Sequence, residues 1–161
     1  MQVENVDAMD RKILALLQEN ARITSAELSE RVNLSPSQCH RRWRRLEELG
    51  LIKGYAALLD PEKLGLGVEA FVNVTLEKHG ADPARSFVET IGRYPEILEC
   101  HSVTGEADYV LRVVARDLKA FSGFLMTRLL TMPEVSNVRS NVFLDELKST
   151  TALPLEATGA D

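Results

Sequence analysis

Cysteine is scarce in this chain of 161 residues, which has two, Cys39 and Cys100, far apart in the sequence. Two cysteines are too few for a small fold held by disulfides, and such scarcity is typical of a reducing compartment. Nowhere do about eighteen apolar residues follow one another, so we expect no membrane-spanning helix and no membrane partner. The opening residues, MQVENVDAMDRK, lack the basic and apolar regions of a secretory signal. The sequence therefore predicts a cytoplasmic protein.

Motifs for catalysis or metal binding are also lacking. The dipeptide Cys-His occurs at 39–40 and at 100–101, which superficially offers four zinc ligands. Adjacent side chains point about 100° apart on a helix and to opposite faces of a strand, so neither pair converges easily on one ion or forms a nucleophilic pair. The glycines of KLGLGVE precede an expected strand, whereas a phosphate-binding loop precedes a helix. We therefore predict no catalytic residue, no metal site, no cofactor and no enzyme activity.

The charges are distributed unevenly along the chain. The formal net charge is −5, yet residues 1–60 hold nine basic and nine acidic side chains, whereas residues 61–161 hold ten and fifteen. The one dense basic cluster, CHRRWRRL, has four arginines and lies in the neutral first part. Two parts with different partners are therefore expected.

Two helices are expected before residue 33. Apolar residues at helical spacing predict a first helix that ends before residue 20 and is opened by Asp7 or Asp10. The segment SAELSERV predicts a second helix over 25–32, with Ser25 as its cap. A tight turn at Asn33 then leads to the basic cluster.

The third helix has unusually clear ends. In SPSQCHRRWRRLEELG, Ser35 can cap the start, Pro36 suits the first helical position, and Gly50 can adopt the left-handed conformation that ends a helix. On a helical wheel Trp43 lies beside Cys39, so we expect the tryptophan to pack in the core. The opposite face holds Ser37, His40, Arg41, Arg44 and Glu48, with Gln38 and Arg45 at one edge.

The basic face of this helix suits DNA. A solvated face with internal ion pairs is the usual explanation of a charge run, but Glu47 and Glu48 follow the arginines, which is the weaker order for such pairs. They also lie in the last turn, where the helix dipole disfavours negative charge. Arginine can bind guanine, glutamine can bind adenine, and serine reaches phosphates. Two helices joined by a tight turn form a helix-turn-helix, whose second helix enters the major groove. The predicted DNA contacts are Ser35, Ser37, Gln38, His40, Arg41, Arg44 and Arg45.

After Gly50 the pattern changes to one of strands and helices. A short strand is expected over 51–60, and DPEKLGLG is expected to be a linker. The following strands and helices are expected in the order βαββαβ, at 69–77, 82–94, 96–103, 108–115, 117–130 and 134–147. This order predicts an α+β protein whose second domain is a ferredoxin-like sandwich. The expected inward-facing residues are Ala70, Val72, Val74, Leu76, Phe87, Val88, Ile91, Leu118, Phe121, Leu125 and Leu129.

These patterns divide the chain into four parts. The expected parts are a helix-turn-helix domain at 1–53, a strand and linker at 54–66, a ferredoxin-like domain at 67–149 and a C-terminal tail at 150–161.

The segment DRKILALLQENARITSAELSERVNLSPSQCHRRWRRLEELGLIKGY resembles the N-terminal domain of the Lrp/AsnC, or feast/famine, transcriptional regulators. The resemblance continues through GYAALLDPEKLG, the turn TGEADYVLRV and the closing strand. It implies a DNA-binding domain joined to a βαββαβ effector domain, and dimers that often assemble into octamers. The sequence departs from the family at Trp43, where an aliphatic residue is common, and at the basic pair His40–Arg41.

The turn VTGEADY is a candidate ligand site. Taken alone, it is most simply a polar hairpin turn. Backbone N–H groups around Gly105 could instead hold a ligand carboxylate while Glu106 or Asp108 pairs with an α-ammonium group. The resemblance implies that small amino acids bind near this turn, at contacts between subunits. The predicted effector-binding residues are Thr104, Gly105, Glu106 and Asp108.

The sequence thus predicts a regulator of amino-acid metabolism or transport that binds double-stranded DNA and responds to a small amino acid. Because one helix reads only a few base pairs, we expect a homodimer on a palindromic operator, and the resemblance implies assembly to an octamer. The alternative is a small-molecule-binding module that acts on a protein partner, with its basic helix against an acidic protein surface.

Overall fold

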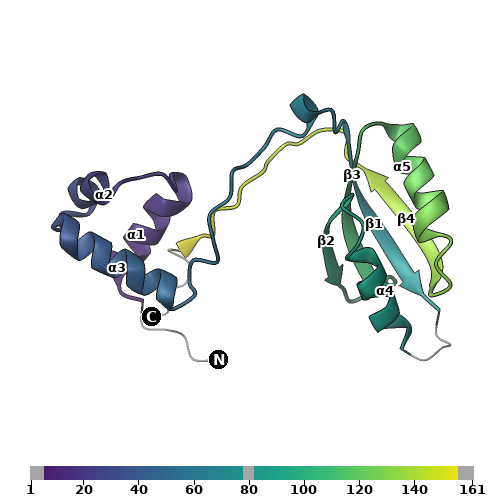
Figure 1. The fold of residues 1–161 in the computed structure, drawn as a ribbon, viewed down its shortest axis with the longest axis horizontal. Coiled ribbons are helices and arrows are strands. Elements are labelled where there is room, and N and C mark those ends of the chain that lie inside the picture. Colours follow the sequence, from purple (N-terminus) through teal and green to yellow (C-terminus); the bar gives the residue numbers. More distant parts are fainter. Residues whose placement is uncertain (1–5, 78–81, 156–161) are drawn as a thin grey trace. The chain divides into compact units, whose positions relative to one another are not determined.

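The computed structural model describes residues 6–77 and 82–155. The chain divides into two compact units, one of Met1–Leu58 with Lys148–Asp161 and one of Leu59–Leu147. We refer to them as the helical unit and the sheet unit, and Figure 1 shows the elements of each. In the described part of the chain, no helix is long and apolar enough to cross a membrane.

The helical unit contains three helices, α1 (Ala8–Glu19), α2 (Ser25–Val32) and α3 (Pro36–Glu48), as expected. Each begins with a capping box, in which the cap side chain accepts from the third helical N–H and the third side chain accepts from the cap. The pairs are Asp7 with Asp10, Thr24 with Glu27, and Ser35 with Gln38.

The prediction that Ser25 caps α2 was wrong by one residue, because the cap is Thr24. Only this register places Glu27, a side chain able to accept a hydrogen bond, at the third helical position. If Ser25 were the cap, the third helical position would be Leu28, whose side chain cannot accept a hydrogen bond. The tight turn before α3 is confirmed, since Asn33 has the left-handed φ of 55°.

The core of the helical unit is apolar. It consists of Ile13, Leu17, Ile23, Leu28, Val32, Cys39 and Leu46. Trp43, expected to pack in this core, packs against it but is only partly buried. Its indole N–H instead bonds a residue of the segment after α3, which keeps one edge of the ring near the surface.

The strand expected over 51–60 is absent, since these described residues form no ladder with any described strand. Ile52 packs against the core of the helical unit, but the leucines further along the segment are exposed, Leu58 at 79% and Leu59 at 71%. A strand requires a neighbour to satisfy its backbone groups, and the four strands of the sheet unit pair only with one another. The apolar residues of this segment therefore do not mark a strand.

The sheet unit has the predicted order βαββαβ. Its elements are β1 (Val68–Leu76), α4 (Pro83–Ile91), β2 (Ile97–Ser102), β3 (Tyr109–Ala115), α5 (Leu118–Phe124) with a π turn (Leu125–Leu129), and β4 (Val135–Val142). A short 3₁₀ turn, Glu62–Leu64, precedes them. All pairings are antiparallel, in the order β2-β3-β1-β4. The α+β class and the ferredoxin-like arrangement are confirmed.

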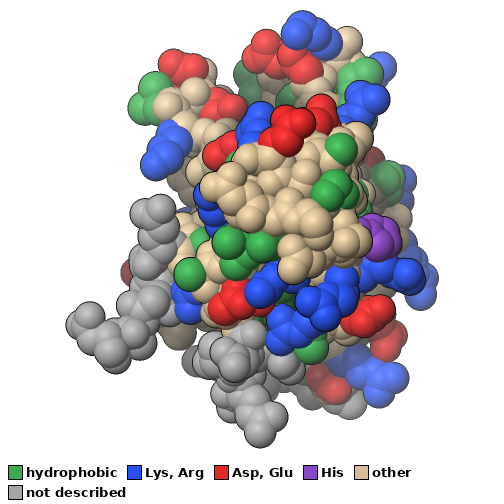
Figure 2. All heavy atoms as spheres, turned by 90° about the vertical axis from the view of Figure 1, so that its left-hand side faces the viewer, with side chains coloured by type: hydrophobic (Ala, Val, Ile, Leu, Met, Phe, Trp, Pro, Cys, Tyr) green, Lys and Arg blue, Asp and Glu red, His purple; other side chains and the backbone are tan. Residues whose placement is uncertain are grey.

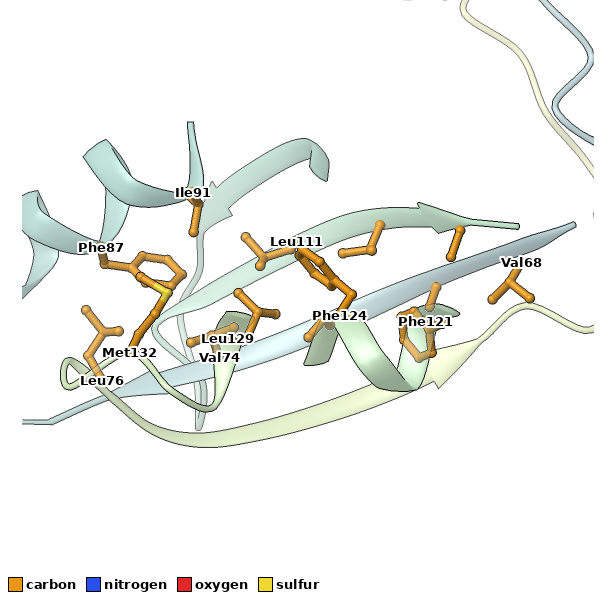
Figure 3. Close-up of a cluster of buried hydrophobic side chains, with 14 residues drawn as sticks. Val68, Val74, Leu76, Phe87, Ile91, Leu111, Phe121, Phe124, Leu129 and Met132 are labelled. Atoms are coloured by element: carbon orange, nitrogen blue, oxygen red, sulfur yellow. The ribbon is translucent and has the colours of Figure 1, made fainter. Parts of the chain in front are cut away.

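The core of the sheet unit lies between the sheet and the helices α4 and α5 (Figure 3). The predicted inward face of β1 is confirmed, because Ala70, Val72, Val74 and Leu76 are all buried. Two predicted core residues are exposed, Val88 at 49% and Leu118 at 61%.

Local helix geometry explains both errors. Val88 follows the buried Phe87 and therefore points about 100° away from it. Leu118 is the first residue of α5 and lies beyond the sheet contact. The π turn widens the spacing of the next buried residues, so that Phe124 and Leu129, five apart, both reach the core.

Candidate nucleic-acid interface and ligand site

The N-terminal end of α3 presents hydroxyl and amide groups to solvent. Ser35 and Ser37 share a hydroxyl contact of 3.1 Å, and the Gln38 side-chain oxygen accepts from the Ser35 backbone N–H at 3.1 Å. All three side chains are exposed. The carbonyl of the Gln38 amide is therefore used in capping, which directs its NH₂ group, a donor for base edges or phosphates, away from the cap.

His40, Arg41 and Arg44 are exposed on α3, as predicted. Within residues 6–77 and 82–155, neither Arg41 nor Arg44 forms an ion pair. Figure 2 shows the helical side of the molecule, where basic side chains gather with acidic ones on either side and uncharged surface above. An internally neutralised helix face therefore does not explain these two arginines, and their cations can meet phosphates or base edges.

Arg45, also predicted as a DNA contact, has a carboxylate partner inside the protein. Its Nη1 donates to Asp10 Oδ2 at 3.1 Å, and Arg42 Nη1 donates to Asp10 Oδ1 at 2.7 Å. Arg42 also bonds Asp7 at 2.8 Å. The Asp10 N–H, and beyond it Arg42, stabilises the ionised Asp7 carboxylate, which lowers its pKa below the ordinary value of 3.8.

The segment that follows α3 is attached to it by a polar chain. Trp43 Nε1 donates to the Tyr55 hydroxyl at 2.6 Å, and this hydroxyl donates to Glu47 Oε1 at 2.8 Å. Burial first, and then Glu47, raises the pKa of the Tyr55 hydroxyl, since both disfavour the phenolate. The segment carrying Tyr55 is therefore fixed to the predicted reading helix by side chains of that helix.

In the sheet unit, the turn between β2 and β3 borders a hollow of about 590 Å³ on the sheet face opposite the helices. Two of the predicted effector residues, Thr104 and Glu106, line it. The remaining lining residues come mostly from β1 and β4; they are Asn73, Thr75, Val103, Ala107, Val110, Asn137, Arg139 and Asn141. Within this lining Arg139 Nη1 is paired with Glu106 Oε2 at 3.2 Å, so a cation and an anion border the same hollow.

The other two predicted effector residues shape the turn. Gly105 has a φ of 115°, a conformation that strains any residue with a side chain. Asp108 Oδ2 accepts the backbone N–H of Leu76 at 2.8 Å, at the end of β1. The structure therefore brings Thr104 and Glu106 into the hollow and gives Gly105 and Asp108 roles in holding the turn.

Sequence reasoning missed the opposite wall of the hollow, above all Arg139. The available signal was strongest on β1, where Asn73 and Thr75 lie between buried residues. On β4, which has no buried residue, the lining residues Asn137, Arg139 and Asn141 occur at every second position, but their neighbours Ser136 and Ser140 are polar too. What the sequence does not give is that β4 pairs with β1, which places Arg139 opposite Asn73.

Comparison with known families matches a known domain to each of the two parts of the chain that carry these candidate sites. Residues 69–153 match the Lrp/AsnC ligand-binding domain, and residues 6–53 match a winged helix-turn-helix DNA-binding domain. The chain belongs to the Lrp/AsnC family of transcriptional regulators. As an Lrp/AsnC protein, it is a DNA-binding transcriptional regulator with a ligand-binding domain.

Relatives of this Lrp/AsnC protein are similar over almost their full length. The DNA-binding transcriptional activator DecR of Escherichia coli (strain K12) is 39% identical over 94% of this chain and 99% of its own. The leucine-responsive regulatory protein of the same strain is 39% identical over 95% and 93%. A transcriptional regulator of Neisseria meningitidis, solved as a complex with L-Met, superposes with a TM-score of 0.91 at 46% identity, over 94% of this chain and 97% of that one.

Proposed function

We propose that this Lrp/AsnC regulator responds to a small amino acid that binds in the hollow beside Thr104 and Glu106. The observation that supports this most directly is the presence of Arg139 and Glu106, a cation and an anion, in the lining of one polar hollow. A free amino acid has a carboxylate and an ammonium group on one carbon atom. Arg139 suits the first group and Glu106 the second, through charge-assisted hydrogen bonds.

The existing ion pair does not oppose this binding. The side chains of Arg139 and Glu106 are 72% and 90% exposed, and ion pairs so exposed contribute little to stability. Exchanging this contact for two contacts with a ligand therefore costs little. The complex of the Neisseria meningitidis regulator with L-Met and the name of the leucine-responsive protein support the same class of ligand.

On the DNA side, α3 reads a palindromic operator through Ser35, Ser37, Gln38, His40, Arg41, Arg44 and Arg45. Because one such helix contacts few base pairs, a homodimer binds two half-sites about one helical turn apart. Further assembly to an octamer follows the family resemblance. The regulated genes serve amino-acid metabolism or transport, since a bound amino acid then reports the supply of the compound that their products make, degrade or transport.

The effector proposal is tested by calorimetric titration of the full chain with each of the twenty amino acids. One or a few should bind, and binding should weaken at least about tenfold in Glu106→Gln and in Arg139→Gln, since each loses a charge-assisted contact. The matched control is Arg85→Gln, because Arg85 also forms an exposed ion pair, with Glu89 on α4, far from the hollow in sequence. Equal binding by all three variants would place the ligand elsewhere.

A further inference from the structure

Asp10 is the one charged or polar side chain buried among the described residues, with 1% of its surface exposed. It lies on α1, which is not one of the two helices of the helix-turn-helix. A buried carboxylate is costly to desolvate unless it is paired and hydrogen-bonded. A carboxylate buried at this place therefore needs an explanation, and the groups that pair with it indicate its role.

Both oxygens of Asp10 are directed at the basic helix. Oδ1 accepts from Arg42 at 2.7 Å and Oδ2 from Arg45 at 3.1 Å, so one carboxylate holds two arginines that lie three residues apart on α3. The neighbouring carboxylate, Asp7, bonds Arg42. The arginine side chains remain 30% and 45% exposed, so their far sides reach solvent.

A purely structural tie between α1 and α3 explains this arrangement poorly. Ile13 and Leu17 of α1 share one apolar core with Cys39 and Leu46 of α3, so the helices are already packed together. An apolar pair of similar volume commonly stabilises such a contact as well as a buried ion pair does, or better. An apolar residue could neither accept the Asp7 N–H of the capping box of α1 nor fix the direction of a guanidinium group, and only the second of these acts on α3.

Fixing that direction affects recognition. An arginine side chain that is free in solution loses rotamer freedom when it binds a base or a phosphate, and an arginine that is already held loses less. Arg41, Arg42 and Arg45 line one surface hollow of about 350 Å³ together with the two aspartates. The guanidinium groups of Arg42 and Arg45, which Asp10 holds, therefore border the same hollow as the predicted DNA contact Arg41.

We propose that Asp10 is a positioning residue for DNA recognition. It holds the guanidinium group of Arg45 from the protein side, so that this arginine meets the operator in one orientation. The proposal rests on the proposed reading of DNA by α3. Its effect is on specificity, the ratio of the affinities for the operator and for random duplex.

The change in charge alone predicts the opposite effect on operator affinity. Asp10→Asn removes a negative charge next to the basic helix, which by itself strengthens attraction to any duplex. Loss of positioning instead weakens operator binding, because an amide offers Arg42 and Arg45 one neutral acceptor in place of two charged ones. A variant with more net positive charge and weaker operator binding would therefore separate positioning from electrostatics.

The experiment measures dissociation constants of the full chain for its selected operator and for random duplex at several salt concentrations. In Asp10→Asn the specificity ratio should fall about tenfold, comparable with a lost arginine–base contact, while random-duplex binding stays equal or tightens. The matched control is Asp7→Asn, which makes the same charge change, keeps a capping side chain and leaves the contact between Asp10 and Arg45. It should keep the ratio within about twofold. An unchanged ratio in Asp10→Asn, or equal losses for both duplexes, would overturn the proposal.

Two further variants keep the test independent of folding. Thermal unfolding shows whether Asp10→Asn is folded at the assay temperature. Arg45→Lys changes an exposed side chain and keeps its charge but lacks the forked group that Asp10 orients, so its ratio should fall similarly; a retained ratio would also overturn the proposal. In an Arg45→Gln background, adding Asp10→Asn should lower the ratio little further, and a full additional loss would show that Asp10 does not act through Arg45.

The two levels of the proposal fail differently. If Arg41→Ala/Arg44→Ala leaves operator binding intact, the reading role of α3 itself is wrong. If that double variant abolishes operator binding while Asp10→Asn keeps the specificity ratio, only the positioning role of Asp10 is wrong.

Discussion

The indole of Trp43 and the phenol of Tyr55 are joined by a 2.6 Å hydrogen bond, with the two rings edge to face at a centroid distance of 6.5 Å. Trp43 is the only tryptophan of the chain and lies in the middle of α3, the predicted reading helix. Tyr55 lies on the segment that leaves this helix. The fluorescence of the chain's single indole therefore reports on the attachment of that segment.

Tyr55→Phe removes the acceptor for Trp43 and the donor to Glu47 while keeping the ring. We expect the free energy of unfolding of the helical unit to fall by about 1 kcal/mol, the usual net contribution of a hydrogen bond. The emission of Trp43 should also shift, because its N–H then faces water. Urea unfolding followed by tryptophan fluorescence measures both.

Tyr94→Phe is the matched control. Tyr94 is a tyrosine of the sheet unit that contacts Phe124 and Arg128 through its ring. Its loss of a hydroxyl should leave the emission of Trp43 and the urea midpoint that it reports unchanged. A Tyr55→Phe protein with wild-type emission would contradict the attachment.

Acid should destabilise the helical unit through Asp7. The hydrogen bond from the Asp10 N–H, and then Arg42, lowers the pKa of Asp7 in the folded protein, so its ionised form is favoured by folding. This stability is present above the unfolded pKa, near 3.8, and is lost as pH falls through the lower folded value. Asp7→Asn still caps α1 but does not titrate, so its unfolding free energy should depend less steeply on pH below about 4.

The readout is again the fluorescence of Trp43 in urea, at a series of pH values. Asp60→Asn is the control, because the pKa of Asp60 is also lowered, by its hydrogen bonds with Lys63, but Asp60 belongs to the sheet unit. That variant should follow the wild-type acid profile. Parallel profiles for Asp7→Asn and the wild type would show that Asp7 contributes nothing to acid sensitivity.

Asp108 is expected to stabilise the turn beside the ligand hollow. Asp108→Ala leaves the partly buried N–H of Leu76 without its acceptor, which should cost about 1–3 kcal/mol of unfolding free energy. Asp108→Asn keeps a side-chain oxygen at the same place and should lose clearly less. Circular dichroism during denaturation measures both variants, and equal losses would contradict the hydrogen bond as the cause.

Features set by local chemistry were predictable from the sequence. Ser35, Pro36 and the basic run define α3 without any tertiary information, and the alternation of residues 70–76 defines the inner face of β1. The strand expected over 51–60 failed for a related reason. A short run rich in apolar residues shows that a segment could pair, but whether a partner strand exists depends on the whole fold.

Contacts between distant residues were beyond sequence reasoning. Nothing local indicates that Arg45 meets Asp10, 35 residues earlier, because an arginine with a partner inside the protein and one without look alike in a helical pattern. The placement of Arg139 across from Glu106 similarly depends on the pairing of β4 with β1. Sequence reasoning therefore located the elements that carry each motif, while the side chains that face those motifs were missed.

The reading role of α3 is tested most directly by selecting bound sequences from a pool of random duplexes, with wild type beside Arg41→Ala/Arg44→Ala. Arg85→Ala/Arg93→Ala, which removes two basic residues of the sheet unit, is the charge-matched control. We predict a palindromic motif for wild type and control that is lost in the Arg41/Arg44 variant, with the salt dependence of residual binding reduced by about one to two counterions. The same motif retained by the Arg41/Arg44 variant would contradict the assignment of α3 as the reading helix.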